Sequence, residues 1–189
     1  MQRPLAPAVP GVRNDARMTR RRGLIASGVA MVALLLAMSP AENRMKDTGG
    51  AGMVPFELSG GQHRADEILA EWGEDGQDAA RGQLWIDFGF LLAYGCFLTF
   101  ALAAVLDLAR KRGWRRVGGV VVFFGALGAS FDALENICLL LTLGGAGAAF
   151  PTLATIFATC KFTLLTVAIA YLIAGVGMHL LSRPVERTS

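Results

Sequence analysis

Hydrophobic residues in this chain gather in four long runs, which are separated by polar or glycine-rich stretches. A run of ~20 apolar residues is long enough for a helix to cross the ~30 Å hydrocarbon core of a bilayer. The runs predict four membrane-spanning helices, at about 23–38, 83–108, 117–143 and 150–181. The first run is at the lower edge of the spanning length. We expect an all-α fold, a bundle of four transmembrane helices.

These spans divide the chain into five parts. The parts are a basic cytoplasmic tail at 1–22, a first span at 23–38, an extracytoplasmic loop at 39–82, a bundle of three spans at 83–181 and a cytoplasmic tail at 182–189. The sides follow from the positive-inside rule, by which arginine and lysine are enriched in cytoplasmic segments. Both tails and the connection around Arg112 are rich in arginine, whereas the loop has four basic residues against nine acids. An even number of spans agrees with both termini in the cytoplasm.

The beginning of the chain allows two processing outcomes. Arg20, Arg21 and Arg22 precede a short apolar run, as in a signal peptide, loosely of the twin-arginine type. Cleavage after Ser39 would leave Pro40 at the first mature position, which signal peptidases tolerate poorly. We expect a retained signal-anchor helix. Cleavage would leave three spans and make the outer segment the mature N-terminus.

The loop changes character near Gln62. Residues 39–55 are rich in glycine, proline and small polar residues, which favours irregular structure. From Gln62 onward acids alternate with apolar residues, and Ile68, Leu69 and Trp72 share one face of a helix. We expect an extracytoplasmic amphipathic helix at the outer interface, with Trp72 at headgroup level. This helix would either cap the bundle or act as a lid over a site below.

The composition supports a membrane protein and excludes several other classes. Of 189 residues, 53% are hydrophobic and 17% are charged, against ~25% charged in soluble domains. The basic residues follow the predicted topology and form no patch, so no nucleic-acid partner is expected. Cys96, Cys138 and Cys160 all lie in apolar runs and form no C-x-x-C pair. This predicts buried thiols, and neither a disulfide framework, a metal site nor a cofactor.

Four ionisable side chains interrupt the predicted spans: Asp87, Asp132, Glu135 and Lys161. A charge at the bilayer centre costs from ~2.5 to more than ~10 kcal/mol, depending on the method. Such residues normally face the interior of the bundle, pair with one another and mark a functional site. If all four ionised, the site would carry two net negative charges. We therefore expect at least one acid to hold a proton near neutral pH, because desolvation and like charges both favour the neutral form.

The depths of these residues predict how they pair. Tyr94, Asp132 and Lys161 lie at similar distances from the outer ends of their spans, near the midplane. We expect a central Lys161–Asp132 pair, with Tyr94 and Asn136 as hydrogen-bonding neighbours and the other acids in a ladder toward the outer loop. A purely structural clamp would explain the pair alone, but a clamp needs only two residues. The candidate site residues are Asp87, Tyr94, Asp132, Glu135, Asn136 and Lys161.

Several segments, in this order and spacing, resemble a family of small uncharacterised bacterial integral membrane proteins. The segments are Phe56-Glu57-Leu58, Ile68-Leu69-x-x-Trp72, Asp87-Phe88-x-Phe90-x-x-x-Tyr94, Phe131-Asp132-x-x-Glu135-Asn136 and Lys161-Phe162. The resemblance covers the chain from Phe56 to about Gly175. It implies a four-helix protein of the bacterial inner membrane and no assigned biochemistry.

Three classes of function remain open. We favour a binding protein for a small apolar or amphipathic ligand, with proton-coupled transport as an extension. Against active transport, no inverted repeat is apparent, although a homodimer could supply a missing half. The first alternative is an accessory subunit that packs against a larger membrane complex. The second is an intramembrane enzyme acting on lipid, which is less favoured because no nucleophile has an adjacent base. Membrane lipid is the expected partner in each case.

Overall fold

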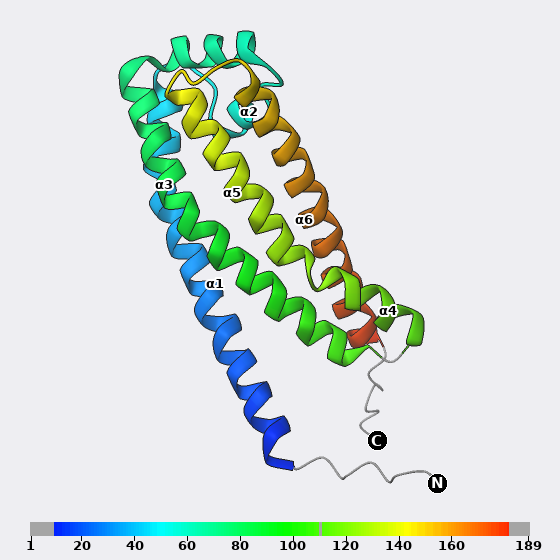
Figure 1. Ribbon diagram of the computed structural model, residues 1–189. Coiled ribbons are helices and arrows are strands. Elements are labelled where there is room, and N and C mark those ends of the chain that lie inside the picture. The colour runs from blue at the N-terminus through cyan, green and yellow to red at the C-terminus, as the bar shows by residue number, and fades with distance from the viewer. Residues whose placement is uncertain (1–9, 110, 182–189) are drawn as a thin grey trace.

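The computed structural model describes residues 10–109 and 111–181, with side chains from Met18 onward. The predicted tail at 182–189 and residues 1–9 of the other tail lie outside the described residues. Within the described ranges every regular element is a helix, which confirms the all-α prediction (Figure 1). The helices are α1 (Pro10–Asp47), α2 (Met53–Glu57), α3 (Gln62–Leu108), α4 (Arg112–Val121), α5 (Phe124–Leu143) and α6 (Ala149–Leu181).

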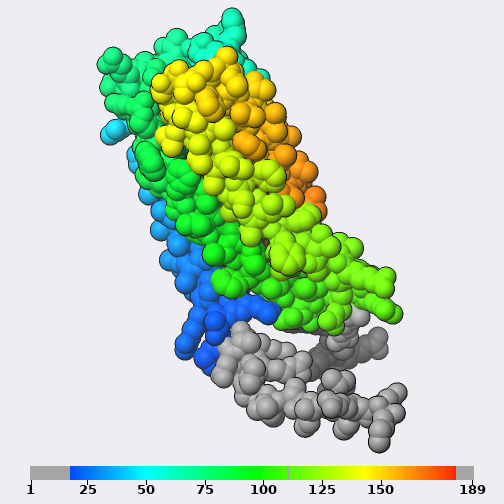
Figure 2. Space-filling view, viewed as in Figure 1, coloured from blue at the N-terminus to red at the C-terminus, as the bar shows by residue number. Residues whose placement is uncertain are grey.

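Four helical segments are long and apolar enough to cross a membrane, in agreement with the four predicted spans. They are Met18–Asp47, Gln62–Leu108, Arg112–Leu143 and Ala149–Leu181. The beginning of α1 and the end of α6 lie at the same end of the bundle, and α5 runs between α3 and α6 (Figure 1). The space-filling view shows the same order, with α1 along one edge (Figure 2). The fold is that of a multi-pass membrane bundle.

The first helix is much longer than the predicted span at 23–38. α1 begins at Pro10, within the predicted tail, and continues through Pro40 to Asp47, so the prediction of a loop from residue 39 is wrong there. A proline inside a helix removes one backbone hydrogen bond. In the turns after Pro40, Met45 is fully buried, and the Lys46 ammonium pairs with the Glu42 carboxylate at 2.9 Å. These tertiary and local contacts keep the last turns helical.

A sharp turn divides α3 at Gly73. Gly73 has φ +59° and ψ −166°, a conformation that a side chain would disfavour. The residues before the turn form a helix across the end of the bundle, and those after it form the second span (Figure 1). We call the helix at residues 62–72 the crossing helix. Gly73 thus lets one continuous segment cover the bundle and then enter it.

The crossing helix buries the residue that was expected to face lipid headgroups. Trp72 is only 1% exposed, its ring packs on Phe56 with centroids 5.0 Å apart, and its Nε1 donates to the Ala51 carbonyl at 2.5 Å. The placement of Trp72 at headgroup level is therefore wrong. The apolar face at Ala65, Ile68 and Trp72 turns inward because α2 and the end of α1 give it an apolar surface to cover.

The third predicted span is two helices. α4 ends at Val121 and α5 begins at Phe124. Packing against α6 holds α4: Trp114 stacks on Tyr171 with centroids 4.4 Å apart, and the Tyr171 hydroxyl donates to the Trp114 carbonyl at 3.1 Å. The break between Val121 and Phe124 therefore allows α4 to pack against α6.

Two hydrophobic clusters form the core. One lies beneath the crossing helix and includes Met45, Phe56, Ile68, Trp72, Leu84 and Leu139. The other follows α3, α5 and α6 and includes Leu91, Tyr94, Leu98, Ala129, Ala168 and Tyr171. Within the second cluster, α3 and α5 approach closely enough that a Cβ on Gly125 would lie 3.0 Å from the Gly95 carbonyl oxygen.

Replacing Gly125 with valine is expected to destabilise the protein by about 1–3 kcal/mol, because overpacking forces two backbones apart. The Cβ would also meet the Thr99 nitrogen at 3.0 Å, and backbone atoms cannot rotate away. Gly177→Val is the matched control, since a Cβ there meets nothing within 4 Å. Equilibrium unfolding in mixed micelles, followed by circular dichroism, measures both. Equal stability of the two variants would contradict the close approach.

Candidate functional site

Three carboxylates surround one buried lysine. Lys161 projects from α6, and its Nζ lies 2.7 Å from Glu135 Oε2, 2.9 Å from Asp132 Oδ1 and 3.5 Å from Glu57 Oε2. Asp132 and Glu135 come from α5, three residues apart and therefore on neighbouring positions of one helix face. Lys161 is 6% exposed and Glu135 is fully buried. We call these four residues the lysine cluster.

Two hydrogen bonds extend the lysine cluster toward α3. The Tyr94 hydroxyl donates to Asp132 Oδ2 at 2.8 Å, so both oxygens of that carboxylate are engaged. Asn136 Nδ2 donates to Asp87 Oδ2 at 2.6 Å. The structure thus brings all six sequence-predicted residues into one region, contributed by α3, α5 and α6.

The detailed pairing differs from the sequence-based expectation at two residues. Asn136 bonds to Asp87 and not to the Lys161–Asp132 pair. Glu135 contacts Lys161 directly instead of continuing a ladder toward the loop. Glu135 makes the shortest of the three lysine contacts, so it belongs to the centre of the site.

Glu57 is the member of the lysine cluster that sequence reasoning did not select. It lies at the end of the five-residue helix α2, outside any predicted span. Its backbone is fastened to α6: Thr155 Oγ1 donates to the Glu57 carbonyl at 2.9 Å and accepts the Gly60 N–H at 2.9 Å. Two signals in the sequence pointed to it: Glu57 stands in the Phe56-Glu57-Leu58 segment of the resemblance, and it directly follows an aromatic residue of a short apolar stretch.

The site has more acceptors than donors. Asp87 and the three acids of the lysine cluster face one lysine, which leaves three net negative charges if all ionise, one more than expected. Among the buried oxygens of the site, Gln83 Oε1 and Glu135 Oε1 have no hydrogen-bond partner among the described residues, and Glu57 Oε2 has only the Lys161 ammonium at 3.5 Å. A buried acceptor without a donor costs ~1–3 kcal/mol. The arrangement is therefore poorly explained as a clamp optimised for stability.

A cavity of about 530 Å³ adjoins the cluster. Its polar end is formed by Glu42, Glu57, Gln83, Asp87, Tyr94, Asp132 and Lys161. Its apolar walls include Met31 and Met38 of α1, Phe97 and Leu98 of α3, and Leu165, Ile169 and Leu172 of α6. The volume is within the ~300–1,000 Å³ range of small-molecule sites. The cavity thus joins an apolar chamber to a charged end.

The cavity is lined by residues of both α1 and α6. α1 packs along α3, and no extended packing joins α1 to α6 in the described part of the chain. Ile169 is 48% exposed although it lines the cavity. The cavity therefore adjoins the lateral surface of the bundle.

The described residues contain no group of three or more histidine, cysteine or acidic side chains arranged to hold a metal ion. Cys138 is buried, Cys160 is half-buried and Cys96 is exposed. The prediction that all three thiols are buried is therefore wrong for Cys96, which lies on an outward face of α3. The chemistry available at the site is that of carboxylates, an ammonium group, an amide and a phenol.

Four long apolar helices with a charge cluster enclosed among them define a multi-pass helical membrane protein. Comparison with known proteins adds no closer identity: no family model, no curated protein and no solved structure matches the chain. The resemblance to a family of small bacterial membrane proteins stays a prediction. The cavity and the lysine cluster are consequently the features that point to a function.

Replacing Tyr94 with phenylalanine is expected to destabilise the protein by about 1.5–3 kcal/mol, the usual value of a hydrogen bond to a charged group. The Asp132 oxygen that accepts this bond is buried, so no solvent replaces the lost donor. Tyr171→Phe is the control, because its hydroxyl donates to a neutral carbonyl and should cost about 0.5–1.5 kcal/mol. Unfolding in mixed micelles measures both, and a smaller loss for Tyr94→Phe than for Tyr171→Phe would contradict the assignment.

Proposed function

We propose that this protein binds a small amphipathic ligand within the bacterial inner membrane. The ligand's apolar chain lies along the chamber walls and its polar head reaches the charged end of the cavity. The observation that carries the proposal is the continuity of the two: Leu165 and Ile169 line the same cavity as Asp132 and Lys161. An ion pair that served only to fix the helices relative to one another would not require an adjoining cavity.

The ligand enters from the bilayer, between α1 and α6. Support for this route comes from the absence of extended packing between these helices and from the exposure of Ile169. A ligand with an apolar chain partitions into the hydrocarbon core, so lateral entry needs no passage through water. The crossing helix then acts mainly as a cap over the end of the bundle.

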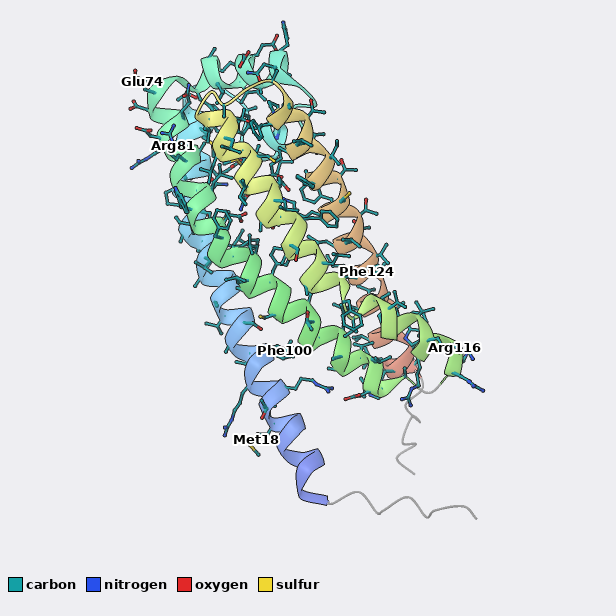
Figure 3. The ribbon with its side chains drawn as sticks, in the orientation of Figure 1. Met18, Glu74, Arg81, Phe100, Arg116 and Phe124 are labelled. Carbon is teal, nitrogen blue, oxygen red and sulfur yellow. The ribbon has the colours of Figure 1, made fainter. Side chains whose placement is uncertain are left out.

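We place both termini in the cytoplasm and the crossing helix on the extracytoplasmic side. Charge supports this orientation: Arg112, Arg115 and Arg116 gather at one end of the bundle, and the acidic crossing helix lies at the other. Arg116 and Glu74 mark these opposite ends (Figure 3). The arrangement follows the positive-inside rule and includes a retained signal-anchor, α1.

Proton coupling is the extension of this proposal. The buried acids outnumber the cations, and protons on the carboxylates are one way to balance the charge. A ligand that interacts with the same carboxylates would change the number of bound protons. Proton release or uptake on ligand binding, measured with an indicator dye in weakly buffered nanodiscs, tests the extension.

Filling the chamber tests the proposed function directly. Ile169→Trp is expected to lower labelling by a decanol that carries a photoreactive diazirine by about tenfold, equivalent to ~1.4 kcal/mol of binding. The protein is embedded in phosphatidylcholine nanodiscs, and labelled peptides are identified by mass spectrometry. In the unaltered protein, label is expected on cavity-lining segments of α1 and α6, such as those with Met31 and Leu172.

Ile173→Trp is the matched control. Ile173 lies one turn further along α6, is 69% exposed and does not line the cavity. This variant should be labelled like the unaltered protein. Equal labelling of both tryptophan variants, or label spread evenly over the lipid-facing surface, would contradict a ligand in the chamber.

A further inference from the structure

We propose that the ligand carries a primary ammonium head on an apolar body. This inference rests on the proposed function, because it names the chemical class that the same cavity accepts. It is drawn from the kind of polar atoms that are left without partners, from the charge at the polar end of the cavity and from the aromatic side chains around it.

The unpaired atoms at the site are acceptors. Gln83 is 6% exposed, lines the cavity, and its Oε1 has no donor among the described residues. Glu57 also lines the cavity, and its Oε2 has only the lysine at 3.5 Å. Such atoms are matched by a ligand group that donates hydrogen bonds. An ammonium group has three N–H donors and no acceptor.

The charge at the polar end of the cavity favours a cation. The groups that line it come from every surrounding helix: Glu42 from α1, Glu57 from α2, Asp87 and Tyr94 from α3, Asp132 from α5, and Lys161 from α6. Glu135 of α5 adds a further acid through its contact with Lys161. Glu42 is already matched by Lys46 at 2.9 Å. The remaining four acids have one cation between them. Because a buried charge is tolerated when it is paired, a second cation compensates the excess better than a neutral head does.

Aromatic rings add a second form of cation recognition. Phe90 and Tyr94 pack with ring centroids 5.4 Å apart, and both line the cavity together with Phe97. Ring faces attract ammonium groups within about 6 Å. Lys161 itself lies 4.7 Å from the centroid of the Phe162 ring, so the site already holds one ammonium in this way. An anionic head would meet both the acids and the negative ring faces.

Four ten-carbon probes separate charge from hydrogen-bond donation. Decylammonium has both, decyltrimethylammonium has charge alone, 1-decanol has a donor alone, and decanoate is an anion. Each competes with the photoreactive decanol for the full-length protein in phosphatidylcholine nanodiscs. Decylammonium is expected to compete about tenfold better than each of the others, a difference of ~1.4 kcal/mol. Decanoate is expected to compete least.

Substitution of single acids assigns the recognition to the site. Glu57→Gln and Asp87→Asn are each expected to weaken decylammonium about tenfold relative to 1-decanol, again ~1.4 kcal/mol. Retained decanol competition shows that each variant is folded. Glu67→Gln is the control, because Glu67 is an exposed acid of the crossing helix, outside the cavity. This variant should bind all probes like the unaltered protein.

The outcomes distinguish this inference from the proposed function. Equal competition by decylammonium and 1-decanol overturns the ammonium head and leaves an amphiphile site. Equal competition by decyltrimethylammonium overturns the need for N–H donors. Failure of all four probes overturns the site itself. Replacing part of the phosphatidylcholine with phosphatidylethanolamine then shows whether the ammonium head belongs to a lipid or to a free amine. If the site accepts the lipid, phosphatidylethanolamine competes and decylammonium binding falls. If the site accepts only a free amine, decylammonium binding is unchanged.

Discussion

Lys161→Met is expected to destabilise the protein by about 3–5 kcal/mol, because removing one partner leaves buried charges uncompensated. Methionine preserves most of the volume of the side chain, so the loss reports charge and not packing. Three carboxylates within 3.5 Å of Nζ would lose their shared cation. Equilibrium unfolding in mixed micelles at neutral pH measures the effect.

Two further variants separate a clamp from a functional site. Lys46→Met removes an exposed lysine that pairs with Glu42 and should cost about 1 kcal/mol or less. The triple variant Lys161→Met, Asp132→Asn, Glu135→Gln removes the cation with its two nearest acids. If the triple variant recovers most of the stability that Lys161→Met loses, the charges of the cluster serve only to neutralise one another, as in a structural clamp. A neutral or stabilising Lys161→Met would show that the native charges are held at a cost, as expected of a site that serves a ligand.

Trp72→Ala is expected to cost about 3–5 kcal/mol, the usual loss on truncating a buried large aromatic side chain. The indole fills the space between the crossing helix and α2, where it packs on Phe56 and bonds to the Ala51 carbonyl. Its removal should loosen residues 62–72 before the spans unfold. Hydrogen exchange measured by mass spectrometry should therefore rise first in that segment.

Trp85→Ala is the control for this truncation. Trp85 is 65% exposed, so its loss opens no buried cavity. We expect it to change stability by less than about 0.5 kcal/mol, as for most surface positions. If Trp72→Ala behaved like Trp85→Ala, the crossing helix would not be anchored through Trp72, and a mobile lid would replace the cap.

The spans and the polar residues inside them could be predicted because the bilayer penalises each polar residue strongly. A charged side chain such as Lys161 or Asp132 stands out against an apolar run, and burial in the bundle is the way to avoid lipid. The same reasoning found Tyr94 and Asn136 through helical spacing and depth. Hydrophobic runs, polar interruptions and helical spacing are all properties of a single segment, so each can be recognised without knowing the rest of the fold.

The structure differs from the sequence-based predictions where contacts between distant segments determine the local conformation. Ser39 to Asp47 reads as loop, yet it is helical because Met45 is buried beneath the crossing helix. Trp72 reads as an interfacial residue, yet α2 provides it with an apolar surface. Glu57 is held at the site by Thr155, 98 residues later, which binds its backbone, and by the packing of Phe56 on Trp72. Periodicity within one segment carries no information on such partners.

The threonine bonds between α2 and α6 have a mechanical consequence. Thr152 and Thr155 hold the backbone at Gly60 and Glu57, and Lys161 lies six residues beyond Thr155 on the same helix. If α6 slid along α5, these bonds would make Glu57 move with Lys161, whereas Asp132 and Glu135 would remain with α5. A small axial slide of α6 would exchange the α5 partners of the lysine while Glu57 stays beside it. The ammonium of Lys161 would keep one counter-ion through the whole movement.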